Sequence, residues 1–237
     1  MTGNNFNGKV GEEYDLLLMA MPHYGRVQES VGLALKNHFS KIKKERFEVT
    51  ELGCGTGITT PYILESDPRV VLTCVDKEPI MIDQAKKRKW VRKYGERLRF
   101  VVDDSESYFR DLPLDSLDAV ASAYMLHNLY DIERPGILKQ INNALAPKGI
   151  FVNADKVAQD GDEHNYHLKW QLDMLKIYDT IGRQDYRKAW EEHYLFDNQP
   201  GIIWREAKLI SDFNGAGFKG IKRTFREHME ATFSAIK

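Results

Sequence analysis

The amino-acid sequence predicts an α/β fold built on a mostly parallel β-sheet. Short runs of apolar and β-branched residues alternate with stretches of helical periodicity, and a glycine-rich turn follows the first of these runs. Strands that alternate with helices form βαβ units, whose strands are parallel and whose ligands bind beyond the carboxyl ends of the strands. The expected strands cover residues 47–52, 70–75, 98–102, 117–123 and 149–153.

Helices are expected before and between these strands. Apolar residues recur at helical spacing from Glu13 to Phe39, and Pro22 divides this stretch into two helices joined by a turn. A polar, aromatic-rich helical insertion and two closing strands are expected after the parallel core. The remaining helices are expected at 59–65, 79–94, 133–145, 160–197 and 204–214, and the closing strands at 218–225 and 230–236.

We expect four segments along the chain. An N-terminal helical cap segment (1–46) precedes an α/β core (47–155), and a helical insertion (156–200) forms the rest of the cap. A C-terminal helix and strand pair (201–237) completes the core. The aromatic side chains of the insertion could line a pocket for a substrate, form a homodimer contact or fill the core of the cap. The sequence does not separate these three alternatives.

Composition narrows the class of partner. The chain of 237 residues carries 34 Lys and Arg against 35 Asp and Glu, and this balance argues against a nucleic-acid partner because such proteins usually carry a basic excess. No apolar stretch approaches the ~18 residues that a membrane helix needs, so no membrane partner is expected. Two cysteines and a polar N-terminus without a signal-peptide pattern predict a cytoplasmic protein.

The central motif is the glycine-rich turn Gly53-Cys54-Gly55-Thr56-Gly57, between the first expected strand and a helix. Glycines let the backbone turn sharply and approach a ligand that a Cβ would exclude. Asp76 ends the next expected strand, where a carboxylate can accept hydrogen bonds from both ribose hydroxyls. The motif lacks the third glycine at the spacing of a dinucleotide fingerprint, so it predicts a different nucleoside ligand.

The run E-x-G-x-G-x-G from Glu51 to Gly57 resembles the motif of class I S-adenosylmethionine-dependent methyltransferases, and later segments resemble that family in the same order. These are Asp76 to Met81, Asp103 to Ser105, Leu117 to Leu129 and Leu145 to Gly149. The resemblance implies a Rossmann-like seven-stranded sheet, mostly parallel with a terminal antiparallel strand. It also implies S-adenosyl-L-methionine as the cofactor.

The resemblance implies a set of cofactor-binding residues. Gly53 and Gly55 would hold the methionine half, Asp76 the ribose, and Asp104 with the Ser105 amide the adenine. Tyr24, after the Pro22 turn, would approach the methionine carboxylate. The full expected set is Tyr24, Glu51, Gly53, Cys54, Gly55, Asp76, Lys77, Met81, Asp104, Ser105 and Tyr124.

His127 is a candidate general base, because it follows the fourth expected strand and we expect it to face the cleft. The alternative is that it only packs beside the cofactor. His164 and His167 lie three residues apart, but no further ligand stands at a known spacing, so no metal is expected.

Several flanking residues look similar to those of carboxy-S-adenosylmethionine synthases, which share the methyltransferase fold, attach a carboxylate to the cofactor and work in tRNA modification. In that group an arginine of the cap is implied to pair with the added carboxylate, and Arg187 matches it by its spacing to Asp197. The alternative is a surface arginine on a charged helix. The loop of that group reads G-C-S-x-G, whereas Gly55 stands here in place of the serine.

We therefore expect an enzyme, an S-adenosylmethionine-dependent methyltransferase acting on a small-molecule acceptor. The first alternative is a cofactor-modifying enzyme similar to the carboxy-S-adenosylmethionine synthases. The second is a non-catalytic nucleoside-binding protein on the same fold. The methyl group of a sulfonium is already activated, so the protein mainly has to align the donor and the acceptor.

Overall fold

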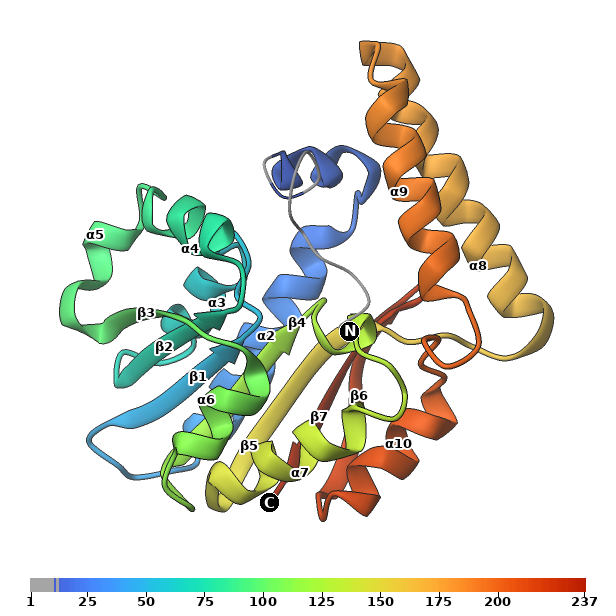
Figure 1. The fold of residues 1–237 in the computed structure, drawn as a ribbon. Helices are drawn as coiled ribbons and strands as arrows, with labels where there is room; N and C mark the ends of the chain where they lie inside the picture. The colour runs from blue at the N-terminus through green and yellow to red at the C-terminus, as the bar shows by residue number, and fades with distance from the viewer. Residues whose placement is uncertain (1–10, 12) are drawn as a thin grey trace.

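The chain folds around a single sheet of seven strands (Figure 1). The computed structural model describes residue 11 and residues 13–237, so the first part of the expected segment 1–46 lies outside the described residues. The strands are β1 (Phe47–Leu52), β2 (Val70–Asp76), β3 (Leu98–Val102), β4 (Leu117–Ala123), β5 (Leu145–Lys156), β6 (Lys219–Glu227) and β7 (Glu230–Ile236).

The spatial order of the strands is β3-β2-β1-β4-β5-β7-β6. Strands β1 to β5 pair in parallel, and β7 is antiparallel to both β5 and β6. The predicted seven-stranded, mostly parallel sheet with a terminal antiparallel strand is confirmed. The chain builds β1, β2 and β3 outward to one side and then crosses to β4, so β1 and β4 flank the point where the strand order reverses. In such sheets the ligand crevice lies at this point, beyond the carboxyl ends of the strands.

Helices cover both faces of the sheet. Side chains of a strand alternate between the faces, and in β1 Val49 belongs to one hydrophobic core and Leu52 to the other. The first core contains α2 (Tyr24–Phe39), α3 (Thr60–Ser66) and α4 (Pro79–Lys86). The second contains α6 (Ser105–Asp111), α7 (Arg134–Ala144) and α10 (Glu206–Gly215).

The expected helical insertion forms α8 (Gly161–Met174), the 3₁₀ helix η4 (Leu175–Ile181) and α9 (Gln184–Asp197). These elements project away from the sheet (Figure 1). The 3₁₀ helix η1 (Tyr14–Ala20) contacts η4, whereas α2 packs directly on the sheet against β4, β5 and β7. The insertion and η1 therefore form a cap, while α2 belongs to a helix layer of the core.

The structure differs from the sequence prediction most clearly at three elements. The single helix expected at 79–94 is wrong: α4 ends at Lys86, and only a short α5 (Val91–Tyr94) and η2 (Gly95–Arg97) follow. The break places Arg88 against the glycine-rich loop, where its Nε donates to the Thr56 carbonyl at 2.9 Å. Strand β5 is longer than expected because Lys156 at its end pairs with Glu230 of β7. Helix α6 was not expected.

The described part of the chain contains no helix with the length and apolar character needed to span a lipid bilayer.

Helix α2 approaches α3 so closely that only glycine fits at one position. A Cβ on Gly32 would lie 2.7 Å from the Tyr62 carbonyl oxygen, whereas a Cβ on Gly25 would meet nothing within 4 Å. Gly32→Ala should therefore lower the free energy of unfolding by about 1–3 kcal/mol through overpacking. Gly25→Ala, on the same helix, should raise it by roughly 0.4–1 kcal/mol because the unfolded chain loses freedom. Urea denaturation checks both values, and equal effects of the two substitutions would contradict the close approach.

Candidate functional site

The glycine-rich loop after β1 is fixed against β2 and against the loop after β4. The backbone N–H groups of Gly53 and Cys54 donate to the Val75 carbonyl at 2.8 and 3.0 Å. Gly53 has a φ of +67°, and a Cβ there would lie 2.6 Å from the Cβ of Met125. The loop therefore requires glycine at this position both for its backbone conformation and for its distance from Met125.

Asp76, the last residue of β2, holds the loop from the other side. Its Oδ2 accepts the Gly55 N–H at 2.8 Å, and its Oδ1 accepts the Glu78 N–H at 2.9 Å. Burial raises the pKa of the Asp76 carboxyl, although both N–H donors oppose this shift. Each oxygen keeps a lone pair for a further donor, so the carboxylate can still accept a bond from a ligand hydroxyl.

Asp104 stands at the end of β3 as the N-cap of α6. Its Oδ1 accepts the Ser107 N–H at 2.9 Å, and this bond lowers the pKa of the Asp104 carboxyl. The sequence Asp104-Ser105-Glu106-Ser107 carries the N-cap signal that could have revealed α6. The cap fixes Asp104 and Ser105 at the edge of the sheet next to Asp76.

A cleft of about 650 Å³ opens at the carboxyl ends of β1, β2, β3 and β4. All the expected cofactor-binding residues line it except Glu51, so the structure brings together Tyr24, Gly53, Cys54, Gly55, Asp76, Lys77, Met81, Asp104, Ser105 and Tyr124. The opposite wall was not expected from the sequence, because it comes from the loop after β4 and from α7. Its residues include Met125, Asn128, Leu129, Ile132, Gly136 and Gln140.

Glu51 lies beneath the loop rather than in the cleft. Its Oε2 accepts hydrogen bonds from the Thr60 hydroxyl at 2.6 Å and from the Cys74 thiol at 3.3 Å. The side chain is buried, and burial raises the pKa of its carboxyl from 4.5 to about 7. In the described structure Glu51 therefore supports the loop from below.

Two tyrosines stack at the β4 side of the cleft. The rings of Tyr24 and Tyr124 are nearly parallel, with centroids 5.0 Å apart. Tyr124 adopts a φ of +54°, which is strained for a residue other than glycine and is typical of functional sites. Its buried hydroxyl has no hydrogen-bond partner among the described residues. An unpaired buried hydroxyl costs free energy, and a ligand that hydrogen-bonds to it would offset this cost.

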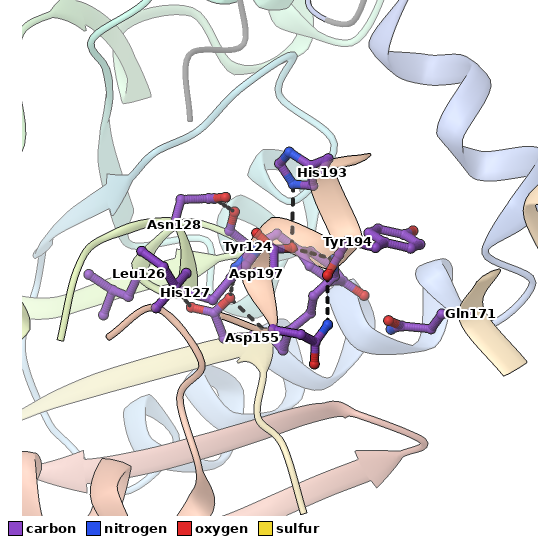
Figure 2. Close-up of polar contacts among 12 residues, drawn as sticks. Tyr124, Leu126, His127, Asn128, Asp155, Gln171, His193, Tyr194 and Asp197 are labelled. Carbon is purple, nitrogen blue, oxygen red and sulfur yellow. Dashed lines mark hydrogen bonds and ion pairs between the residues drawn. The ribbon is translucent and has the colours of Figure 1, made fainter. Parts of the chain in front are cut away.

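His127 does not line the cleft, and the expectation that it faces the cofactor is wrong for this arrangement. It belongs to the short 3₁₀ helix η3 (Leu126–Asn128), and its Nδ1 pairs with Asp155 at the end of β5. Its Nε2 points to Asp197 of α9, 3.8 Å from Oδ2 (Figure 2). The side chain lines a second, much smaller cavity together with Lys156 and Asp197.

Arg187 also lies outside the cleft. Its guanidinium pairs with Asp179 and donates to Glu191 at 2.7 Å on the outer surface of the cap. Asp197, ten residues further along, instead accepts a bond from the Lys156 ammonium at 2.8 Å. The placement corrects the expectation that Arg187 faces the cofactor and favours the alternative of a surface arginine on a charged helix.

Residues 49–149 match the family model of a methyltransferase domain. The match covers a little less than half of the chain. The matched segment runs from β1, through the glycine-rich loop and Asp76, to the start of β5, so it contains the residues on which the sequence resemblance rests. The recognition of a methyltransferase-type enzyme from the sequence is confirmed.

Known proteins extend this likeness beyond the domain. A carboxy-S-adenosyl-L-methionine synthase from Campylobacter curvus is 25% identical over 94% of this chain and 89% of its own length. A malonyl-[acyl-carrier protein] O-methyltransferase from a Paenibacillus species is 29% identical over 49% of this chain and 41% of its own length. The first likeness therefore includes the cap, and the second covers about half of the chain.

Solved structures share the fold. Human N-acetylserotonin methyltransferase, solved with S-adenosylmethionine, matches with a TM-score of 0.59 and 17% identity over 96% of this chain. This chain spans 55% of that longer chain, and little more than half of several other solved methyltransferases. At this identity the likeness concerns the methyltransferase fold alone.

The pKa of Glu51 predicts how a substitution there depends on pH. Because the folded pKa of about 7 exceeds the ordinary 4.5, the unfolded chain loses this proton first, and stability falls as the pH rises from 4.5 to 7. Glu51→Gln removes this penalty while its amide oxygen still accepts the Thr60 bond. As the pH rises from 4.5 to 8, the free energy of unfolding of the variant should increase by about 3 kcal/mol relative to that of the wild type.

Urea denaturation of both proteins across this range measures the difference. If the free energies of unfolding of the variant and the wild type differ by the same amount at every pH, the pKa of Glu51 is not raised by folding. Glu48→Gln, at a half-buried position at the start of β1 and outside this buried cluster, is the matched control for the substitution.

Proposed function

We propose that this chain is an S-adenosylmethionine-dependent methyltransferase acting on a small molecule. The observation that carries the proposal is the cleft, which brings the loop Gly53–Gly55, Asp76 and Asp104 together at adjacent strand ends. The methyltransferase domain and a structural neighbour solved with S-adenosylmethionine support this cofactor. The cofactor supplies a methyl group on a positively charged sulfur, which is already activated for transfer.

The residues of the cleft fit this cofactor. Gly55 lines the cleft, and a Cβ there would stand in open space, so the methionine half can approach the backbone of the loop at this residue. The Asp76 carboxylate retains acceptor capacity for the ribose hydroxyls after its two backbone bonds. Asp104 and Ser105, held by the N-cap of α6, would contact the adenine.

The protein's own contribution to the reaction is alignment. No histidine lines the cleft among the residues that the structure describes, so His127 does not serve as a base in this arrangement. The stacked Tyr24 and Tyr124 form a flat, apolar wall at the β4 side, and this wall can orient an acceptor in line with the methyl group. The cap, through Tyr14 of η1, borders the same cleft and would exclude water.

A small-molecule acceptor is supported by charge and shape. The near balance of basic and acidic residues lacks the basic excess that nucleic-acid-binding proteins usually carry. The cleft is a pocket of small-molecule size rather than an open groove.

A carboxy-S-adenosylmethionine synthase-like activity is the second candidate, favoured by the relative that matches over nearly the whole chain. Two features weigh against it. Gly55 replaces the serine of that group's loop, and Arg187 pairs with Asp179 and Glu191 instead of facing the cleft.

The proposal predicts that Asp76→Ala weakens S-adenosylmethionine binding by about 1.5–3 kcal/mol, because the variant loses hydrogen bonds to a charged acceptor. Isothermal titration calorimetry gives the affinity, and the exposed Asp83→Ala on α4 is the matched control that should bind as the wild type does. Affinity for NAD in place of S-adenosylmethionine would overturn the cofactor.

The same variants test the acceptor when the cofactor carries a radiolabelled methyl group. After incubation with a cell extract, the wild type and Asp83→Ala should label the small-molecule fraction, and Asp76→Ala should label it less at subsaturating cofactor. Label in the RNA or protein fraction would contradict a small-molecule acceptor.

A further inference from the structure

A second cluster of polar side chains lies on the other side of the loop after β4. It joins the cap to the core: His193 and Asp197 come from α9, His127 from η3 and Asp155 from the end of β5 (Figure 2). Lys156, the last residue of β5, completes the cluster. His127, Asp155 and Asp197 are buried. The side chains of Lys156 and His193 are nearly buried as well, since each exposes 10% of its surface. The cluster surrounds the small cavity that His127, Lys156 and Asp197 line.

Three atoms of this cluster are arranged as ligands of one ion. The Asp197 Oδ2 lies 3.8 Å from the Nε2 of His127 and 3.5 Å from the Nε2 of His193. All three residues offer ligand atoms within 4.8 Å of one another. A tetrahedral ion with bonds of about 2.1 Å holds its ligands roughly 3.4 Å apart, so the two distances to Asp197 Oδ2 are close to the spacing that such an ion requires.

The orientation of His127 is fixed from behind. Its Nδ1 pairs with Asp155 Oδ1, while Asp155 Oδ2 accepts the His127 backbone N–H at 3.1 Å. A carboxylate on the far nitrogen of a ligating histidine is the usual outer partner at metal sites, because it fixes the tautomer and the ring orientation. The Nε2 of the same ring is thereby directed at Asp197.

Helix α9 supplies two of the three ligands from one face. His193 and Asp197 are four residues apart, so their side chains are neighbours on the helix surface. Two imidazoles and one carboxylate form a ligand set suited to Zn²⁺, Co²⁺ or Fe²⁺, and unsuited to Mg²⁺ or Ca²⁺, which prefer oxygen.

Lys156 is the competitor for this ion. Its ammonium lies 2.8 Å from the same Asp197 Oδ2 and 3.6 Å from the centroid of the Tyr194 ring. A metal on Oδ2 requires the ammonium to leave the carboxylate, and the Tyr194 ring offers it a second partner. The cluster holds two carboxylates against this one ammonium, so its charge favours a further cation.

We propose that His127, His193 and Asp197 bind a divalent transition-metal ion, with zinc as the natural candidate. The three ligands come from the cap and from the segment that forms the β4 wall of the cofactor cleft. A bound ion would therefore hold α9 against the core directly beside Tyr124 and Asn128. The proposal does not depend on the identity of the methyl acceptor.

Metal titration of the full chain, after removal of metal with a chelator and desalting, tests the site. Co²⁺ is the spectroscopic probe, and Zn²⁺ is measured in competition with a chromophoric chelator. The wild type should bind one ion per chain, with the visible absorption of four-coordinate Co²⁺. His193→Ala and Asp197→Asn should abolish that absorption, while His38→Ala, which removes a histidine of α2 outside the cluster, should retain it.

Two further variants separate a metal site from a merely structural cluster. Asp155→Asn should weaken Zn²⁺ binding by about 10–100-fold, as expected for an outer partner. Lys156→Met should tighten it, because the ammonium no longer competes for Asp197 Oδ2. Circular dichroism of each variant in the presence of a chelator shows whether the variant folds without bound metal. Three results would each overturn the proposal: no stoichiometric binding by the wild type, wild-type affinity in His193→Ala or Asp197→Asn, or an affinity in Lys156→Met equal to that of the wild type.

Discussion

The carboxylate of Asp76 is the interaction on which the rest of the site depends. It accepts one backbone N–H from the loop after β1 and another from the start of the segment after β2. Two strand ends are thus joined by one side chain at the edge of the cleft. Gly53 brings the same loop against Met125 of the loop after β4, so the walls of the cleft are set by close backbone contacts rather than by long side chains.

Burial of acidic groups accompanies this arrangement. Glu51 beneath the loop and Asp76 beside it both have a raised pKa because they are removed from water. The loop therefore rests on two carboxyl groups whose charged forms are disfavoured by burial. A positively charged sulfonium nearby would offset part of this cost, which is consistent with the proposed cofactor.

Most of the sheet could be predicted from the sequence, because strands of a parallel core are nearly continuous apolar runs. Strands β1, β3 and β4 match the expected bounds, and the glycine loop and Asp76 fall where the motif indicates. The break after Lys86 was not predicted, because the residues that follow it are suited to a helix and the bond of Arg88 to Thr56 is a tertiary contact that local propensity does not reveal. The length of β5 likewise depends on pairing with β7, far along the chain.

The side-chain clusters were harder to predict than the backbone. His127 was expected to face the cleft, yet Asp155 turns its ring to the opposite side of the loop. The three proposed metal ligands come from η3 and α9, which are far apart in sequence, so the spacing of His193 and Asp197 alone could not have indicated that His127 joins them. Arg187 matched a family position by spacing alone, and its neighbours Asp179 and Glu191 hold it at the surface.

The most direct measurement of the central claim is mass spectrometry of the small molecule that co-purifies with the chain under native conditions. The account predicts S-adenosylmethionine, or its demethylated product, at one molecule per chain. The same cofactor bearing an added carboxyl group would retain the site and replace methyl transfer by the second candidate function. A dinucleotide in the cleft would contradict the account.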